Sequence, residues 1–269
     1  MTWRLLLDAA ADGFTNMAVD EAILEAHLAG EVPPTVRFYR WRPACLSIGY
    51  FQRAAKEVDE DGCRRLGVDW VRRPTGGRAI LHDVELTYSV VGGEGDATVE
   101  GGVLQSYRKI SAALVSGLRR LGVPAEMAPE KMRGPGLGSA ACFDAPSAYE
   151  VTIHGRKVIG SAQVRRGGAR LQHGAILLEV DLDRQVGVLQ PPPGMTAAQL
   201  GELLAPRLTS LSKALGRPVA AEELAVALRA GFEEAWDQPL EERELTVGER
   251  ERAFVLRGKY ASDEWNRRR

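Results

Sequence analysis

The order of strand-like and helix-like patterns along the chain constrains its fold more than any other feature. Strand patterns, which are alternating or β-rich, are expected over 36–41, 46–49, 69–73, 85–91 and, as an antiparallel meander, 149–180. Helical spacing is expected over 103–121, over much of the chain after 196, and over 221–236. Strands and helices do not alternate regularly, which disfavours a doubly wound parallel sheet. We expect an α+β fold in which a mixed, largely antiparallel sheet is flanked by helices.

Capping and breaking residues predict where some elements begin and end. Thr15 or Asn16 is expected to cap the first helix, since both side chains accept hydrogen bonds from backbone N–H groups. The stretch 124–141 is rich in Pro, Gly and Ala without periodicity, so we expect a long loop there. The tail, Asn266–Arg269, is expected to be frayed.

Composition excludes several functional classes. The 269 residues carry 35 basic and 36 acidic side chains, a balance that argues against general nucleic-acid binding. The sequence has no signal peptide and no run of 18 apolar residues, so we expect no membrane association. The three cysteines, Cys45, Cys63 and Cys142, are too scattered for a disulfide framework or a zinc site. We therefore expect a cytoplasmic protein without a bound metal.

The first motif with chemical potential is RRPTGGRAILHD, residues 72–83. Gly76 and Gly77 let the backbone approach a ligand closely, and their N–H groups can face an anion or a carbonyl. Arginine offers a planar fork for a phosphate or carboxylate. The motif is not a P-loop, because G-x-x-x-x-G-K-[ST] is absent. The alternative interpretation is a turn with solvated arginines.

A cysteine and a lysine are the candidates for covalent chemistry. Cys142 follows a loop of small residues and precedes a strand, so it is either an exposed nucleophile or a buried structural cysteine. Cys45 and Cys63 are interpreted as structural. Lys157 is either a surface lysine or a lysine held inward beside the site. In the second case its charge would favour the thiolate and lower the pKa of Cys142.

Further small and polar residues follow Lys157. Gly160, Ser161 and Ala162 have no bulky side chain and would leave room for a ligand chain beside the strand. His173 is either a base or a structural hydrogen-bonding histidine. The sequence shows no defensible order of serine, histidine and aspartate for a hydrolase triad.

Together these motifs resemble the lipoate- and biotin-protein ligase catalytic-domain family. The segment ACFDAPS (141–147), which contains Cys142, resembles the nucleophile segment of that family's octanoyltransferase branch. RRPTGGRAILHD is similar to that family's acyl-binding glycine loop, and GRKVIGSA (155–162) resembles the strand with its essential lysine. KYASDEWN (259–266) resembles an ending common among lipoate ligases. The resemblance implies a fold like that of class II aminoacyl-tRNA synthetases and biotin-protein ligases. It also implies a catalytic domain over 1–215 and a helical extension over 216–269 that packs on the same unit.

The function implied by this resemblance is acyl transfer without a cofactor. Octanoyl would move from octanoyl-acyl carrier protein to a lysine of the glycine cleavage H protein or another lipoyl domain, through a thioester on Cys142 and assisted by Lys157. The substrate-binding residues implied are Arg73, Gly76, Gly77, Arg78, His82, Gly160, Ser161, Ala162 and His173. Arg72, Arg73 and Arg78 are candidates to meet the acidic surface of a partner. The pocket is expected to be apolar and long enough for eight carbons.

Three alternatives stay open. An ATP-dependent lipoate ligase would use an adenylate and need no cysteine. An amidotransferase would move octanoyl between lipoyl domains and would also use a cysteine. A silent binding module would hold a lipoyl or biotinyl domain without chemistry.

Overall fold

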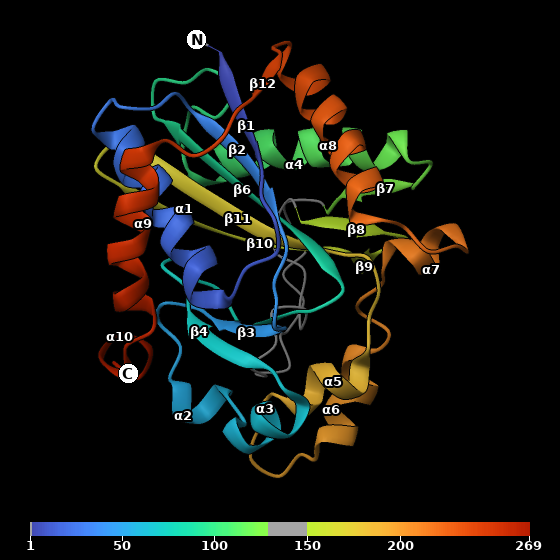
Figure 1. Cartoon of the computed structure of the whole chain (residues 1–269). Coiled ribbons are helices and arrows are strands. Elements are labelled where there is room, and N and C mark those ends of the chain that lie inside the picture. Colours follow the sequence, from blue (N-terminus) through green and yellow to red (C-terminus); the bar gives the residue numbers. More distant parts are fainter. Residues whose placement is uncertain (1, 129–149) are drawn as a thin grey trace.

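Figure 1 shows a computed structural model of the chain, which describes residues 2–128 and 150–269. Its centre is a six-stranded mixed sheet in the order β10-β11-β6-β2-β1-β12. The strands are β1 (Trp3–Leu7), β2 (Thr35–Tyr39), β6 (Glu85–Gly93), β10 (Ile159–Arg166), β11 (Ala169–Leu177) and β12 (Leu240–Glu242). The pairs from β10 to β2 are antiparallel, and β1 lies parallel to both β2 and β12. The expected mixed, largely antiparallel sheet is confirmed.

Two helix pairs cover the two faces of this sheet (Figure 1). One face packs against α1 (Gly13–Leu28) and α9 (Val247–Tyr260), and the other against α4 (Val103–Arg120) and α8 (Ala221–Trp236). The expected cap of the first helix was wrong. Asp12 caps α1 by accepting a hydrogen bond from the backbone N–H of Thr15. A carboxylate at this position also suits the positive end of the helix dipole.

A second, three-stranded sheet in the order β4-β3-β5 carries the motif 72–83. Its strands are β4 (Asp69–Arg72), β3 (Cys45–Ile48) and β5 (Ile80–His82). The short helices α2 (Ala54–Glu57), α3 (Glu60–Leu66), α5 (Leu182–Gly187) and α6 (Ala197–Leu204) gather at this end of the molecule (Figure 1). Cys45 and Cys63 are buried in the apolar clusters here, which confirms that they are structural.

A third sheet, in the order β7-β8-β9, brings Lys157 inward. Its strands are β7 (Ala125–Met127), β8 (Val151–Ile153) and β9 (Arg156–Lys157). The expectation of a loop over 124–141 was therefore wrong at its start, because 125–127 pair with β8; residues 129–141 lie outside the described ranges. The backbone of Lys157 is bonded on both sides to the segment before α7 (Leu211–Leu215), at 2.8 Å to Arg207 and 3.0 Å to Thr209.

The end of the chain is ordered against the second sheet. The last helix, α10 (Asp263–Asn266), leaves Asn266 only 5% exposed, and Arg267 forms an ion pair with Glu60 at 2.7 Å. The expected frayed tail was therefore wrong, because these polar side chains bond to the fold. No helix within the described ranges is long and apolar enough to span a membrane.

A buried ion pair ties α9 to the sheet. The guanidinium of Arg4 donates to both carboxylate oxygens of Glu249, at 2.8 and 2.5 Å, and both side chains are almost fully buried. Glu249 also accepts from the backbone N–H of Thr246, which caps α9. Hydrogen bonds of this kind offset the loss of hydration that two buried charges suffer.

Removing one partner of this pair should destabilise the fold strongly. Glu249→Ala would leave Arg4 buried without its counter-charge, so we expect the free energy of unfolding to fall by about 3–5 kcal/mol. Glu31→Ala, which removes an exposed partner of Arg252, is the matched control, with an expected loss below about 1 kcal/mol. Denaturant unfolding measures both variants. Equal losses would show that the buried pair has no special role.

Candidate active site

The loop 73–78 is shaped from within by the side chain of its first residue. The guanidinium of Arg73 donates to the carbonyls of Gly76 and Arg78, each at 2.7 Å, and to the carbonyl of Ser47 at 3.0 Å. Its Nε also donates to the hydroxyl of Thr75 at 3.1 Å. Arg73 thus fixes the curvature of the glycine loop and joins it to β3.

Two glycines allow the loop to lie directly on the neighbouring strand end. A Cβ atom built on Gly49 would lie 2.0 Å from the carbonyl oxygen of Gly77, so only glycine fits there. Gly77 itself adopts a φ of 85°, which other residues rarely take. A Cβ at Gly77 would also meet Ala162 of β10 at 3.6 Å. The loop therefore covers the part of β10 that follows Lys157.

Arg72 joins this region to the end of the chain. Its guanidinium donates to the carbonyls of Gly49, Tyr50 and Gln52 at 2.7–3.0 Å, and to that of Asn266 at 2.8 Å. The backbone N–H of Arg72 donates to the side-chain oxygen of Asn266 at 2.7 Å. Asn266 thereby pairs with the edge of β4 as a neighbouring strand would.

These contacts correct one expectation. Arg72 is fully buried and Arg73 is 2% exposed, so neither can meet the surface of a partner protein. They are also not the solvated arginines of the alternative interpretation, because burial of a guanidinium requires the internal acceptors just described. Arg78 is half-buried and stays a candidate for partner contact.

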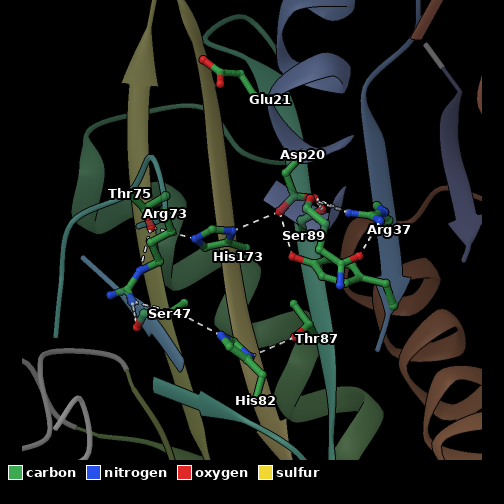
Figure 2. A network of polar contacts seen from close by, with 12 residues as sticks. Asp20, Glu21, Arg37, Ser47, Arg73, Thr75, His82, Thr87, Ser89 and His173 are labelled. Carbon is green, nitrogen blue, oxygen red and sulfur yellow. Dashed lines mark hydrogen bonds and ion pairs between the residues drawn. The ribbon is translucent and has the colours of Figure 1, made fainter. Parts of the chain in front are cut away.

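Behind the loop lies a chain of buried polar contacts that ends in α1 (Figure 2). One ring nitrogen of His173 lies 2.7 Å from the hydroxyl of Thr75, and the other lies 3.0 Å from the carboxylate of Asp20. Asp20 also accepts from Arg37 at 2.8 Å and from Tyr39 at 2.8 Å. Burial alone would raise the pKa of Asp20, but the hydrogen bond from His173 and the charge of Arg37 lower it. Asp20 is therefore a carboxylate that orients His173.

His82 belongs to a second, parallel chain of contacts (Figure 2). Its ring stacks on Trp41 at 4.0 Å and lies 2.8 Å from the hydroxyl of Ser47 and 3.3 Å from Glu85. Burial, with the charge of Arg73 as the next cause, lowers the pKa of His82 well below 6.5. Burial raises the pKa of Glu85 well above its ordinary value. The lowered pKa keeps His82 neutral near neutral pH, which suits a lining for an apolar ligand.

Lys157 is buried, with 2% of its surface exposed, and its ammonium lies 2.5 Å from the carboxylate of Glu150. The inward position of this lysine, one of two open interpretations, is confirmed. Glu150 is also buried and directly follows residues 129–149. Cys142 lies in that interval and so outside the described residues.

The described residues around the two histidines leave little empty space. The cavity between them has a volume of about 10 Å³, with Trp41, Arg73, His82, Ala162 and His173 in its walls. That volume holds about one water molecule. An acyl chain would have to displace side chains to enter this particular cavity, so the expected pocket for eight carbons stays a prediction.

The structure brings together most of the residues singled out from the sequence. The glycine loop, Ala162 and His173 meet at one place, and Lys157 lies upstream on the chain that leads into β10. Ser161 points to the opposite face, where its hydroxyl accepts from Tyr88 at 2.7 Å.

Two residues of the site were not found from the sequence. Asp20 could have been noticed in the sequence, since it and Glu21 interrupt an apolar run of the first helix, where carboxylates would need buried partners. Glu150 carried no such signal, because a single carboxylate at the start of a strand usually faces water.

Fold and motifs together define a catalytic domain of the lipoyl-ligase type. Residues 12–233 match the lipoyl protein ligase A/B catalytic domain, and the chain belongs to that family. It is 50% identical to "Octanoyltransferase LipM" of Kyrpidia tusciae, with 100% of this chain and 99% of that protein covered. It is 47% identical to the protein of the same name from Symbiobacterium thermophilum, over 99% and 98% of the two chains.

Solved structures agree with this assignment. A lipoate-protein ligase A bound with ATP superposes with a TM-score of 0.81 at 31% identity, over 99% of both chains. A bipartite lipoate protein ligase of Thermoplasma acidophilum, studied with its E2 lipoyl domain, gives a TM-score of 0.81 at 30% identity. The coverage there is 99% of this chain and 96% of that one.

The neutral state of His82 should appear in the pH dependence of stability. Its pKa in the folded protein lies below the unfolded value of about 6.5, so the unfolded chain binds the proton first as the pH falls. We expect His82 to reduce the free energy of unfolding by up to about 1.4 kcal/mol per pH unit below pH 6.5. Denaturant unfolding of His82→Gln should show a shallower slope than the parent, and identical slopes would contradict a neutral His82.

The bond between Asn266 and β4 should contribute to stability. Asn266→Ala removes the acceptor for the N–H of Arg72 and the donors to the carbonyls of Tyr260 and Ser262. We expect a loss of about 1–3 kcal/mol, because buried groups are left unsatisfied. Thermal or denaturant unfolding checks this against Arg267→Ala, which removes exposed ion pairs with Glu60 and Asp263 and a contact with the ring of Trp70. A loss no larger than in that control would contradict the assignment.

Proposed function

We propose that the protein transfers octanoyl from octanoyl-acyl carrier protein to a lysine of a lipoyl domain, such as the glycine cleavage H protein, through a thioester on Cys142. The observation that carries this proposal is the buried ion pair of Lys157 and Glu150 at the start of the strand that leads under the glycine loop. Full-length relatives named octanoyltransferase, at 50% and 47% identity, support the same chemistry. The cysteine usage favours a cytoplasmic setting.

The transfer has two steps. In the first, the thiolate of Cys142 attacks the thioester carbonyl of the donor, a new carbon–sulfur bond forms, and the phosphopantetheine thiolate leaves and takes up a proton. In the second, the ε-amine of the acceptor lysine attacks the acyl-Cys142 carbonyl, the amide forms, and Cys142 leaves as the thiolate. The amine loses one proton on the way. Splitting the transfer in this way means that the two partner proteins need not dock at the same time.

Lys157 would act on both steps. Its ammonium beside Cys142 would favour the thiolate, since an opposite charge stabilises the ionised form. In the first step the ammonium would donate the proton that the leaving phosphopantetheine thiolate takes up. The resulting neutral amine of Lys157 would then accept the proton that the acceptor amine loses in the second step, which restores the ammonium. Glu150, 2.5 Å away, is a positioning residue in this scheme, because it fixes the ammonium without touching the substrate.

The remaining residues would bind the acyl chain and the reacting carbonyl. Gly77 lies next to Ala162 of β10. The backbone N–H groups of Gly76 and Gly77 would stabilise the oxyanion, a contribution of about 3–4 kcal/mol per donor. The acyl chain would lie against the lining described above. The residues proposed for these contacts are Arg73, Arg78, His82, Gly160, Ala162 and His173; Ser161, predicted from the sequence as a further contact, points to the opposite face.

A second candidate function is ATP-dependent ligation of free lipoate. The similarity to a lipoate-protein ligase A bound with ATP favours it. That reaction would release pyrophosphate from ATP and lipoate and would not depend on Cys142. Transfer between lipoyl domains differs from the main proposal only in its donor, so the two are separated by supplying octanoyl on a carrier protein or on a lipoyl domain.

The proposal predicts different effects for the two reactive side chains. In a transfer assay with octanoyl-acyl carrier protein and a lipoyl domain, Cys142→Ala should show no transfer. Lys157→Ala should slow transfer by about 10²–10⁴-fold, the usual range for a positioned proton-transfer group. Cys63→Ala is the matched cysteine control and should retain activity. Full activity of Cys142→Ala would overturn the thioester mechanism, and pyrophosphate release with lipoate and ATP would establish the ligase.

Replacing Glu150 tests its positioning role. Glu150→Gln keeps the shape of the side chain but removes the charge next to Lys157. We expect kcat to fall with little change in KM for either protein partner, because Glu150 touches the lysine and not the substrate. The pH–rate profile should also shift, since the lysine loses its counter-charge. An unchanged profile with normal kcat would limit Glu150 to a structural role.

A further inference from the structure

Aromatic and basic side chains form a rim beside the glycine loop. The guanidinium of Arg268 lies 4.3 Å from the ring centre of Tyr50 and 4.9 Å from that of Trp265, and it donates to the hydroxyl of Tyr50. The guanidinium of Arg269 lies 5.3 Å from the ring centre of Phe51. We call these residues, together with Arg78, the arginine rim.

The arginine rim is continuous with the candidate active site. The backbone N–H of Tyr50 donates to the carbonyl of Thr75 at 2.8 Å. A side chain on Gly76 would meet the ring of Phe51 at 4.0 Å. Phe51 is 69% exposed although it is a large apolar residue. A molecule seated on Phe51 would therefore reach the glycine loop without crossing other elements.

Arg268 and Arg269 differ from the preceding arginine in their charge partners. Arg267, the preceding residue, forms ion pairs with Glu60 and Asp263, whereas neither Arg268 nor Arg269 forms an ion pair with any residue that the structure describes. Burial, together with the charges of Arg268 and Arg269, lowers the pKa of Arg72. Positive potential thus accumulates at the loop in a chain whose net charge is −1.

We propose that the arginine rim is the docking surface for the acidic, phosphate-bearing carrier that donates the acyl group. This inference rests on the proposed function and adds to it the surface that binds the donor. The thioester of such a carrier enters the site at the end of an arm with a phosphodiester, so an anion must stay near the entrance. Guanidinium groups bind phosphate and carboxylate oxygens in a planar fork. Stacking on aromatic rings holds the guanidinium of Arg268 in place, which reduces the entropy lost on binding.

The acceptor brings a lysine side chain to the site and no phosphate. The rim should therefore affect the first step of the reaction and not the second. The arginine rim therefore favours the donor as its binding partner. Its effects on the two steps can be measured separately, because acylation of Cys142 and transfer to the acceptor are independent reactions.

The test follows acylation of Cys142 from two donors. The first is octanoyl-acyl carrier protein, and the second is octanoyl-pantetheine, which lacks both the phosphate and the protein. For the double variant Arg268→Glu with Arg269→Glu we expect kcat/KM with the carrier to fall by roughly tenfold or more. We also expect the acylation rate of the variant to decrease less with increasing salt concentration than the rate of the parent protein does. With octanoyl-pantetheine the rate should stay within about twofold. The single variant Arg268→Glu is compared with Arg108→Glu, which reverses the charge of an exposed arginine on α4. Arg108→Glu should change the rate with neither donor.

Each other result overturns the inference. Unchanged kcat/KM with the carrier would show that the rim does not bind it. An equal loss with both donors would show that the variant disturbs the site itself. Slower transfer from pre-formed acyl-Cys142 to the lipoyl domain, with normal acylation, would assign the rim to the acceptor. If the parent protein is acylated by neither donor, the proposed function fails, which is distinct from these outcomes.

Discussion

The site depends on two consecutive guanidinium groups that are buried back to back. The guanidinium of Arg73 donates to carbonyls within the glycine loop and fixes its curvature. The guanidinium of Arg72 joins the start of that loop to the segment after β3 and to Asn266 of α10. Each group is acceptable in the interior only because backbone carbonyls take up its donors, since an uncompensated buried charge costs several kcal/mol. The glycine loop and the C-terminal helix α10 are therefore ordered together.

The same constraint explains the polar residues behind the loop. His173 is held between Thr75 and Asp20, and His82 between Ser47 and Glu85, so each ring has partners at both nitrogens. Buried hydrogen-bond chains that are fully paired fix one geometry, whereas a partly paired chain would destabilise the core. The small cavity between the histidines reflects the close packing of these polar side chains.

Much of this could be predicted from the sequence, and the failures have physical causes. Strand alternation and the helical spacing of α4 and α8 depend on local patterns, so the mixed sheet and its helices were predictable. The roles of Arg72 and Asn266 were not, because their contacts span 194 residues of sequence. A buried arginine and a solvated one look the same in a sequence. Lys157 could be recognised by its motif, but its partner Glu150 could not.

In the proposed mechanism, Cys142 carries the acyl group as a thioester and Lys157 assists both steps of the transfer. The most direct measurement is the intact mass of the purified protein after incubation with octanoyl-acyl carrier protein in the absence of ATP. The account predicts an octanoyl adduct that hydroxylamine removes and that does not form on Cys142→Ala. Absence of any adduct on the parent protein, or an adduct that persists on Cys142→Ala, would contradict it.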